Sequence, residues 1–261
     1  LKHISDKNVK IKFFDVIDST NTQAKRELAE KDGKSLHKTV FVAARQTSGR
    51  GRLGRPFYSP EESGIYLSIV YSDGNITKPA VITASAGVAV ARALKKIYNA
   101  DAKIKWVNDI FVDGKKVCGI LTEGVANFET GMIDAAIVGI GINITTNKNQ
   151  PEELKNIAGS VISSEKNRKQ AELCAEVINE FLLILDGGAE EIKKSMQEYK
   201  ARSFLVGKEI EISPVINTDD KNYKCIVQDV TEDAKLVVKL KNGEIKILDS
   251  GEVSIHSKIV L

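Results

Sequence analysis

The sequence predicts an α+β fold in two parts: a β-sheet flanked by helices over residues 1–205 and a small all-β module over residues 206–261. Up to about residue 203, short apolar runs alternate with stretches whose apolar residues recur every three or four positions, as in amphipathic helices. From about Val206 onward, five short runs of alternating character are separated by polar turns. This second pattern is typical of a small five-stranded barrel.

The first part contains well-marked helices and strands. Ser19 or Thr20 is a suitable N-cap for a helix that ends near Glu30. The helix expected at 79–98 has an alanine-rich apolar face, which predicts close packing on a sheet. Two further helices are expected at 168–186 and 189–203, and strands are expected at 10–17, 39–44, 65–71, 110–112, 117–121 and 132–144. Residues 147–156 are polar and predict a loop.

The second part is marked by its turns. Its five predicted strands lie at about 208–212, 224–230, 235–240, 244–248 and 252–257. Lys241-Asn242-Gly243 is a good hairpin signal between two of them. The boundary between the two parts falls near 204–207.

The composition is that of an ordinary globular protein. Of 261 residues, 42% are hydrophobic and 28% are charged, and 38 basic against 35 acidic residues give a formal net charge of +3. This balance argues against a nucleic-acid coat or a polybasic membrane arm, so any basic function must be local. No run reaches the roughly 18 apolar residues of a membrane span, and the N-terminal residues have no signal-peptide core.

The cysteines and histidines are few and scattered. Cys118, Cys174 and Cys225 are far apart and form no C-x-x-C pair, a pattern that favours reduced thiols in the cytoplasm. The three histidines are equally scattered, so no zinc site is expected.

The strongest local charge excess lies in the stretch Gln46–Tyr58, QTSGRGRLGRPFY. Arginine side chains suit planar oxyanions, and glycines allow a backbone to approach a ligand and a loop to move. We expect a mobile loop that closes over an anionic ligand. Gly49, Gly51 and Gly54 spell G-x-G-x-x-G, but a dinucleotide site requires a helix next, and a strand follows here.

Two other stretches are unusual. Lys105-Trp106-Val107-Asn108-Asp109 holds the only tryptophan among charged and amide residues. One interpretation is a polar edge strand with a packed tryptophan; the other is a site in which packing holds Lys105 as a fixed positive charge. In the apolar run 132–144, Gly139 and Gly141 indicate close approach by a ligand or backbone, and Asn143 is a lone buried amide that needs a partner.

Together these stretches resemble the biotin protein ligases. The resemblance rests on Asp18-Ser19-Thr20-Asn21, the loop 46–55, Lys105–Asp109 with Lys116–Glu123 (KVCGILTE), Gly139–Asn143 (GIGIN), and Ser250–Ile255 (SGEVSI) near the C-terminus. It covers nearly the whole chain. It implies a catalytic domain of the class II aminoacyl-tRNA-synthetase and biotin-ligase type, a mixed sheet flanked by helices, followed by a small SH3-like barrel.

The resemblance also implies a two-step reaction. The carboxylate of biotin attacks the α-phosphate of ATP, which enters with Mg²⁺, and gives biotinyl-5′-adenylate and pyrophosphate. The ε-amine of one lysine on a biotin carboxyl carrier protein then attacks the mixed anhydride and releases AMP. Fixed positive charge is required because a carboxylate and a polyphosphate repel each other.

The site residues that the resemblance implies fall into three groups. Lys105, Arg50 and Arg52 are the catalytic candidates, with Lys105 bridging the carboxylate and the α-phosphate. The residues expected at the biotin site are Ser19, Thr20, Asn21, Gln46, Gly49, Arg50, Gly51, Arg52, Lys105, Gly119, Ile120, Gly139 and Gly141. The residues expected on the nucleotide side are Arg50, Arg52, Arg55, Phe57, Asn108, Lys116 and Asn143.

The chain departs from the family pattern at two positions. Val107 stands where proline is common, and Phe57 stands where tryptophan is common next to the adenylate. The sequence resembles the short form of the family, so no DNA-binding domain and no DNA partner are expected. A homodimer is left open, and the 139–144 strand is one candidate to pair across it, as in relatives.

Two other functions are weighed against this one. A lipoate ligase or octanoyl transferase would share the fold and the carrier lysine, but the arginine loop argues against it. A nucleic-acid-binding module could use the same loop on phosphates, but the near-neutral charge and the 6% aromatic content argue against that.

Overall fold

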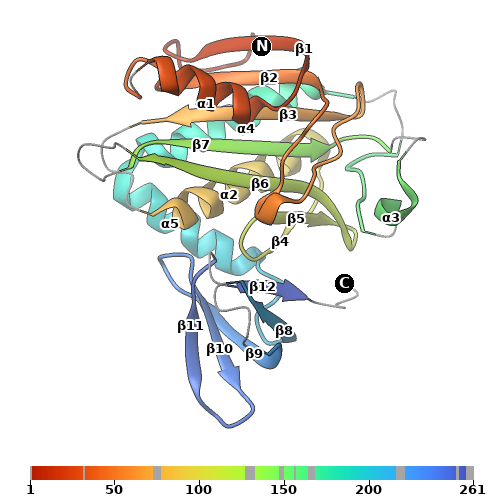
Figure 1. Cartoon of the computed structure of the whole chain (residues 1–261), viewed down its shortest axis with the longest axis vertical. Helices are drawn as coiled ribbons and strands as arrows, with labels where there is room; N and C mark the ends of the chain where they lie inside the picture. Colours follow the sequence, from red (N-terminus) through yellow and green to blue (C-terminus); the bar gives the residue numbers. More distant parts are fainter. Residues whose placement is uncertain are drawn as a thin grey trace.

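A seven-stranded sheet forms the centre of the molecule, and a smaller sheet lies beside it (Figure 1). The computed structural model describes residues 2–31, 33–72, 78–126, 133–146, 150–155, 157–163, 168–215, 221–250 and 253–256. The elements of the first part are β1 (Lys10–Ile17), α1 (Thr20–Glu30), β2 (Thr39–Gln46), the 3₁₀ turn η1 (Arg52–Gly54), β3 (Gly64–Tyr71), α2 (Pro79–Tyr98), β4 (Lys103–Lys105), β5 (Asp109–Val112), β6 (Lys115–Ala126), β7 (Ile133–Asn143), α3 (Glu152–Lys155), α4 (Gln170–Asp186) and α5 (Gly188–Arg202).

The large sheet is mixed, as expected. Its strand order is β1-β2-β3-β7-β6-β5-β4; β1 and β2 run parallel, and every other neighbouring pair is antiparallel. The 139–144 strand, one candidate for pairing across a dimer, is not available for it, because β7 lies between β3 and β6 and both of its edges are already hydrogen-bonded. The edge strands of this sheet are β1 and β4, and Ile104 of β4 forms a bridge with Ser203 on its outer side.

Helices cover both faces of the large sheet. α1 packs on one face, where Ala24, Phe41 and Ile137 belong to a small buried cluster. α2 lies on the other face, and α4 and α5 pack against it (Figure 1). The alanines of α2 allow the close approach that the sequence predicted: a Cβ on Gly87 would lie only 3.5–3.9 Å from isoleucine side chains of β4, β5 and β6.

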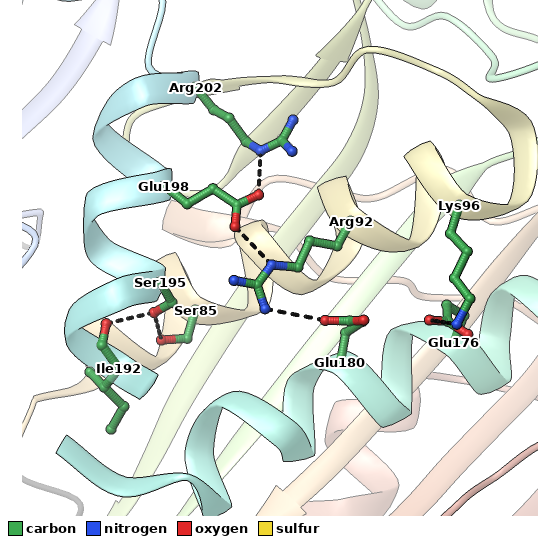
Figure 2. A network of polar contacts seen from close by, with 9 residues as sticks. All are labelled: Ser85, Arg92, Lys96, Glu176, Glu180, Ile192, Ser195, Glu198 and Arg202. Atoms are coloured by element: carbon green, nitrogen blue, oxygen red, sulfur yellow. Dashed lines mark hydrogen bonds and ion pairs between the residues drawn. The ribbon is translucent and has the colours of Figure 1, made fainter. Parts of the chain in front are cut away.

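Ion pairs tie the three helices of this second face together (Figure 2). Arg92 of α2 reaches Glu180 of α4 at 3.2 Å and Glu198 of α5 at 2.8 Å. Arg202 donates from Nε to Glu198 and from Nη1 to the backbone oxygen of Ala102. The network therefore extends from the helices to the segment that leads into β4.

The smaller sheet holds the last strands, β8 (Glu209–Pro214), β9 (Tyr223–Val230), β10 (Leu236–Leu240), β11 (Ile245–Leu248) and β12 (Val253–His256). It is antiparallel with the order β11-β10-β9-β8-β12, and within the described residues β11 and β12 are its two ends. The hairpin predicted at residues 241–243 is confirmed between β10 and β11, where Gly243 has a φ of 90°.

Ion pairs such as Lys78–Asp233 and Lys200–Asp229 join the smaller sheet to the rest, and two further side chains do so by hydrogen bonds to its backbone. Trp106 donates its indole N–H to the backbone oxygen of Ala234 at 2.8 Å. Arg52 donates to the backbone oxygen of Ser250. Both donors lie in stretches that the sequence marked as functional.

Most predicted elements are observed within a few residues of their expected ends. The predicted loop 147–156 contains the short helix α3, and its residues 147–149 and 156 lie outside the described residues. All three cysteines are free and buried, and burial raises the pKa of each thiol. Within the described ranges, no helix combines the length and the apolar character needed to cross a membrane.

Candidate functional site

A cavity of about 340 Å³ lies between the arginine loop and the α1 face of the large sheet. α1 contributes its N-terminal turn, the loop after β2 covers the cavity, and β3 to β7 form its floor. The lining residues are Ser19, Thr20, Asn21, Gln46, Arg50, Gly51, Arg52, Leu53, Arg55, Pro56, Phe57, Leu67, Lys105, Trp106, Asn108, Asp109, Lys116, Gly119, Ile120, Leu121, Gly139, Ile140, Gly141, Leu154 and Ile157.

Strand register brings the distant sequence motifs into one line. Lys105 of β4 is paired with Asp109 of β5, Asp109 with Gly119 of β6, and Gly119 with Gly141 of β7. Residues directly opposite each other in antiparallel strands share a face of the sheet. The lysine, the aspartate and the two glycines therefore form a row across the cavity floor.

The two glycines in this row make room for Phe57. A Cβ on Gly141 would lie 2.4 Å from the ring of Phe57, and one on Gly119 would lie 3.1 Å from it. The ring also meets Tyr66 edge-on, with centroids 6.4 Å apart. The close approach predicted for Gly141 is thus made by an aromatic side chain of the loop.

One end of the cavity is polar and held rigidly. Ser19 caps α1 by accepting from the N–H of Thr22, which confirms the predicted cap. The side-chain oxygen of Gln46 accepts from the backbone N–H of Thr20 at 2.9 Å and from its hydroxyl at 3.2 Å. The amide nitrogen of Gln46 donates to Ser59, which fixes the orientation of the Gln46 side chain.

Asn21 is fully engaged within the protein. Its oxygen accepts from the hydroxyl of Ser68 at 2.6 Å, and its nitrogen donates to Glu123 at 2.9 Å and to the backbone oxygen of Leu121 at 3.3 Å. A Cβ on Gly139 would lie 2.2 Å from the oxygen of Asn21. The absence of a side chain at Gly139 therefore accommodates Asn21.

Ser68 and Glu123 were not predicted as site residues. Ser68 is the one small polar residue in the apolar strand GIYLSIVY, the same signal that singled out Asn143. Glu123 ended a predicted strand, where an acidic residue is ordinary. Its partners come from α1 and the loop, which only the tertiary structure brings together.

The arginine loop folds back on itself. Phe57 donates its N–H to the oxygen of Gly49, and Gly51 donates to the oxygen of Arg55. Gly49 is buried within this fold: a Cβ there would lie 2.4 Å from the oxygen of Phe57. Gly49 therefore does not line the cavity as predicted, and instead allows the loop to pack closely on itself. The strand–loop–strand geometry confirms that G-x-G-x-x-G does not open a helix here.

Arg52 spans from the loop to two other parts of the chain. Its guanidinium donates to the side-chain oxygen of Asn108 at 3.0 Å and to the backbone oxygen of Ser250. Asn108 in turn donates its amide to the oxygen of Ile120. These contacts place Arg52 and Asn108 side by side at the cavity.

The cavity lining carries five cationic side chains and one acidic side chain among the described residues, Asp109. Asp109 pairs with Lys116 at 2.7 Å. Burial lowers the pKa of Lys105, and burial likewise lowers the pKa of Arg52. Burying excess positive charge is unfavourable in the free protein, so the cavity is suited to an anion.

A second cavity of about 140 Å³ adjoins the first on the far side of Phe57. Both cavities are lined by Pro56, Phe57, Lys116, Leu154 and Ile157. Asn143 lines the second cavity with Thr145 and Gly159 and does not line the first. The two cavities together offer space for a ligand with two unlike ends.

The structure thus brings the predicted site residues together with few exceptions. All of them line the first cavity except Gly49, within the loop, and Asn143, at the second cavity. Ile120 lines the cavity, but its side chain packs in the main core near Gly87 of α2.

The lowered pKa of Lys105 gives a pH prediction. The ammonium loses its proton at a lower pH than an ordinary lysine, for which the pKa is about 10.4. Affinity for inorganic pyrophosphate should therefore fall as pH rises through that lowered pKa. Titration calorimetry between about pH 7 and 10 should show this fall in the wild type and a flatter profile in Lys105→Met. Equal profiles would contradict the prediction.

The same shift affects folding in the opposite direction. The unfolded chain binds the Lys105 proton more tightly than the folded chain does. This single group therefore destabilises the fold at neutral pH, and that contribution is relieved as pH rises from the folded pKa towards the ordinary value.

No candidate metal site emerges from the described ranges, where no three acidic, histidine or cysteine side chains cluster. One carboxylate at the first cavity is too few for a protein-held Mg²⁺ site. A divalent ion that arrives on a polyphosphate, with its own water ligands, would not need one.

Comparison with known proteins agrees with the geometry. Residues 13–143, half of the chain, match the family model described as Biotin/lipoate A/B protein ligase family. The bifunctional ligase/repressor BirA of Bacillus subtilis is 39% identical over 151 residues, which are 57% of this chain and 45% of the relative. The chain thus matches about half the length of that relative.

Two longer matches extend over nearly the whole chain. The biotin–[acetyl-CoA-carboxylase] ligase of Mycobacterium tuberculosis is 24% identical over 251 residues, 92% of this chain and 88% of the relative. The solved structure of the biotin protein ligase from Aquifex aeolicus in complex with biotin and ATP has a TM-score of 0.77 and 27% identity and covers 95% of this chain and 98% of its own. The chain belongs to the biotin/lipoate A/B protein ligase family.

Proposed function

We propose that this protein is an ATP-dependent ligase that activates biotin as biotinyl-5′-adenylate and transfers the biotinyl group to a lysine of a biotin carboxyl carrier protein. The observation that carries the proposal is the row from Lys105 to Gly141 beneath the arginine loop. It joins a fixed cation, an apolar floor and a movable set of cations in one cavity. The solved relative with biotin and ATP bound supports the same pair of substrates.

In the first step, the cations bring two anions together. Lys105 lies at the end of the row and would bridge the biotin carboxylate and the α-phosphate. Arg50, Arg52 and Arg55 would hold the phosphates from above. As the carboxylate attacks phosphorus, negative charge grows on the phosphate oxygens, and preorganised cations stabilise this charge more than they stabilise the ground state. MgATP is the substrate, so the ion leaves with pyrophosphate.

The polar end of the cavity suits the ureido head of biotin. Gln46 already orients Thr20 through two hydrogen bonds, so we propose that Gln46 acts mainly by fixing the Thr20 hydroxyl. Ser19 lies beside it at the start of α1. The rings of biotin would lie over Leu121 and the glycines of β7.

The second cavity suits the adenosine end of the nucleotide. Asn143 would contact the nucleoside from there, and Lys116 borders both cavities. Phe57 lies between the two cavities, where its ring would pack on the adenylate.

In the second step, the ε-amine of the carrier lysine attacks the carbonyl carbon of the anhydride, and AMP leaves with the bonding electrons. Closure of the arginine loop would exclude water from this anhydride. Asp109 lies next to Lys105 in the row and would orient it.

We further propose that residues 1–205 form the catalytic domain and residues 206–261 an SH3-like domain. The change from a mixed sheet to a purely antiparallel one after α5 supports this division. The catalytic part would then share the class II aminoacyl-tRNA-synthetase type of fold.

The test is biotin-dependent release of pyrophosphate from MgATP, followed by mass spectrometry of a carrier domain incubated with the same mixture. We expect pyrophosphate only with biotin and a mass gain of one biotinyl group on the carrier. Lipoate and octanoate, offered in competition, should neither release pyrophosphate nor inhibit at matched concentrations. Release with lipoate but not with biotin would reject the proposal in favour of the lipoate branch of the family.

A further inference from the structure

Glu123 is an acidic side chain placed directly behind an anion site. It projects from β6 on the cavity face of the sheet, one step beyond Leu121 and opposite Ile137 of β7. It does not line the first cavity. A carboxylate close to a site for anions would repel the ligand unless neighbouring cations pair with it.

Three side chains from two separate segments converge on this carboxylate. Asn21 and Lys25 of α1 donate to it at 2.9 and 2.7 Å. Arg50 of the loop forms an ion pair with it at 3.5 Å from Nη2 to Oε1. The side chain of Glu123 is only 17% exposed, whereas that of Arg50 is 45% exposed. The buried carboxylate is therefore the fixed member of the pair.

The position of Glu123 is set independently of the loop. Asn21 bonds one of its oxygens and is itself held by Ser68, Leu121 and the close contact with Gly139. Burial alone would raise the pKa of Glu123, but the hydrogen bonds from Lys25 and Asn21 hold it below its usual value. The carboxylate thus stays charged in a place that the core defines.

Among the described residues, Glu123 is the ion-pair partner of the Arg50 side chain. Arg50 lies between Gly49 and Gly51, and a single backbone bridge to Pro56 ties its residue to the loop. An arginine loses much rotamer freedom when it is ordered, so an unanchored arginine binds an anion at a cost. Arg50 approaches Glu123 with its Nη2 atom. Its other N–H groups can therefore still donate to a ligand in the first cavity, which Arg50 lines.

We propose that Glu123 is a positioning residue that holds Arg50 at the mouth of the first cavity before the anionic substrate binds. The identity of that substrate rests on the proposed function; the coupling between Glu123 and Arg50 does not. Lys25 shares the same carboxylate oxygen but attaches it to α1, and it does not line the cavity. The two cations therefore allow the positioning role to be separated from a structural one.

The experiment compares Glu123→Gln, Lys25→Met, Arg50→Ala and the double variant Arg50→Ala with Glu123→Gln. Glutamine keeps an oxygen for Asn21 and removes both ion pairs. We expect Glu123→Gln to lower kcat/KM for biotin-dependent ATP–pyrophosphate exchange about tenfold, mostly through KM. Lys25→Met should change it by less than about threefold. In the Arg50→Ala background, Glu123→Gln should add less than about twofold, because its target is gone.

Three results would overturn the proposal: no effect of Glu123→Gln, an equal loss in Lys25→Met, or an undiminished loss in the Arg50→Ala background. Melting temperatures of all four variants identify any that fail to fold. Glu123→Asp, which keeps the charge, then replaces Glu123→Gln and is expected to show partial loss that again depends on Arg50.

The same variants separate this proposal from the proposed function. If the wild type shows no exchange with biotin, the proposed function fails. The cycle is then measured as affinity for inorganic pyrophosphate by calorimetry. Non-additive losses for Glu123 and Arg50 would uphold the positioning role, and additive losses would reject it.

Discussion

Replacing Lys105 with methionine should lower kcat/KM for biotin-dependent ATP–pyrophosphate exchange by about 10²–10³-fold, the usual loss when one preorganised charge is removed from a reaction site. The melting temperature should stay the same or rise. Lys105 is half-buried, and burial lowers its pKa, so the charge is held at the expense of stability. Methionine fills similar space without that charge.

Lys103 provides the matched control. It lies on the same short strand, faces solvent and pairs only with Asp101 at 3.2 Å among its described neighbours. Lys103→Met should leave both exchange and melting temperature close to wild type. A folded Lys105→Met protein with exchange near that of Lys103→Met would remove Lys105 from the proposed mechanism.

Replacing Gly139 with alanine should damage stability and substrate binding together. The new methyl would lie 2.2 Å from the oxygen of Asn21, and Asn21 cannot shift without breaking its bonds to Ser68, Leu121 and Glu123. We expect a loss of about 1–3 kcal/mol in the free energy of unfolding, as for other overpacked sites. Because α1 would move with Asn21, KM for biotin should rise at least about tenfold.

Gly124→Ala tests whether this effect is local. Gly124 lies on the neighbouring strand β6, and the atoms nearest to a Cβ there would be those of the Ile133 side chain, at 3.4 Å or more. Urea unfolding and the KM for biotin should both stay near wild type. If Gly139→Ala unfolds and binds biotin as Gly124→Ala does, the packing of Asn21 on β7 has no role in the site.

Much of the fold could be predicted because its signals are local. α2 begins at Pro79 and ends at Tyr98 as predicted, since proline suits the first helical turn and twenty residues of apolar periodicity follow it. α3 could not be predicted in the same way, because four residues carry too little periodicity to distinguish a helix from a loop.

The site was predicted as a set of residues but not as a geometry. The sequence indicated that Lys105, Gly119 and Gly141 matter, yet their alignment in one row depends on strand register, which the pairing of distant segments sets. The glycines were expected to admit a ligand or a backbone. Instead they admit Phe57 and Asn21, side chains 62 or more positions away in the chain.

Glu123 illustrates the limit most clearly. In the sequence it is an acidic residue at the end of a strand. Its role comes from Lys25 and Arg50, whose charges approach the same carboxylate oxygen only after α1 and the loop pack near β6. No pattern along the chain encodes that meeting.

The contacts of Arg52 and Trp106 with the smaller sheet have a consequence for how this protein can change in evolution. Both side chains donate to backbone oxygens, those of Ser250 and Ala234. A backbone acceptor is insensitive to which side chain occupies its position, so the smaller sheet is free to diverge in sequence while its chain path is not. Among related proteins, the backbone path of the smaller sheet at these two positions should therefore vary less than its amino-acid sequence.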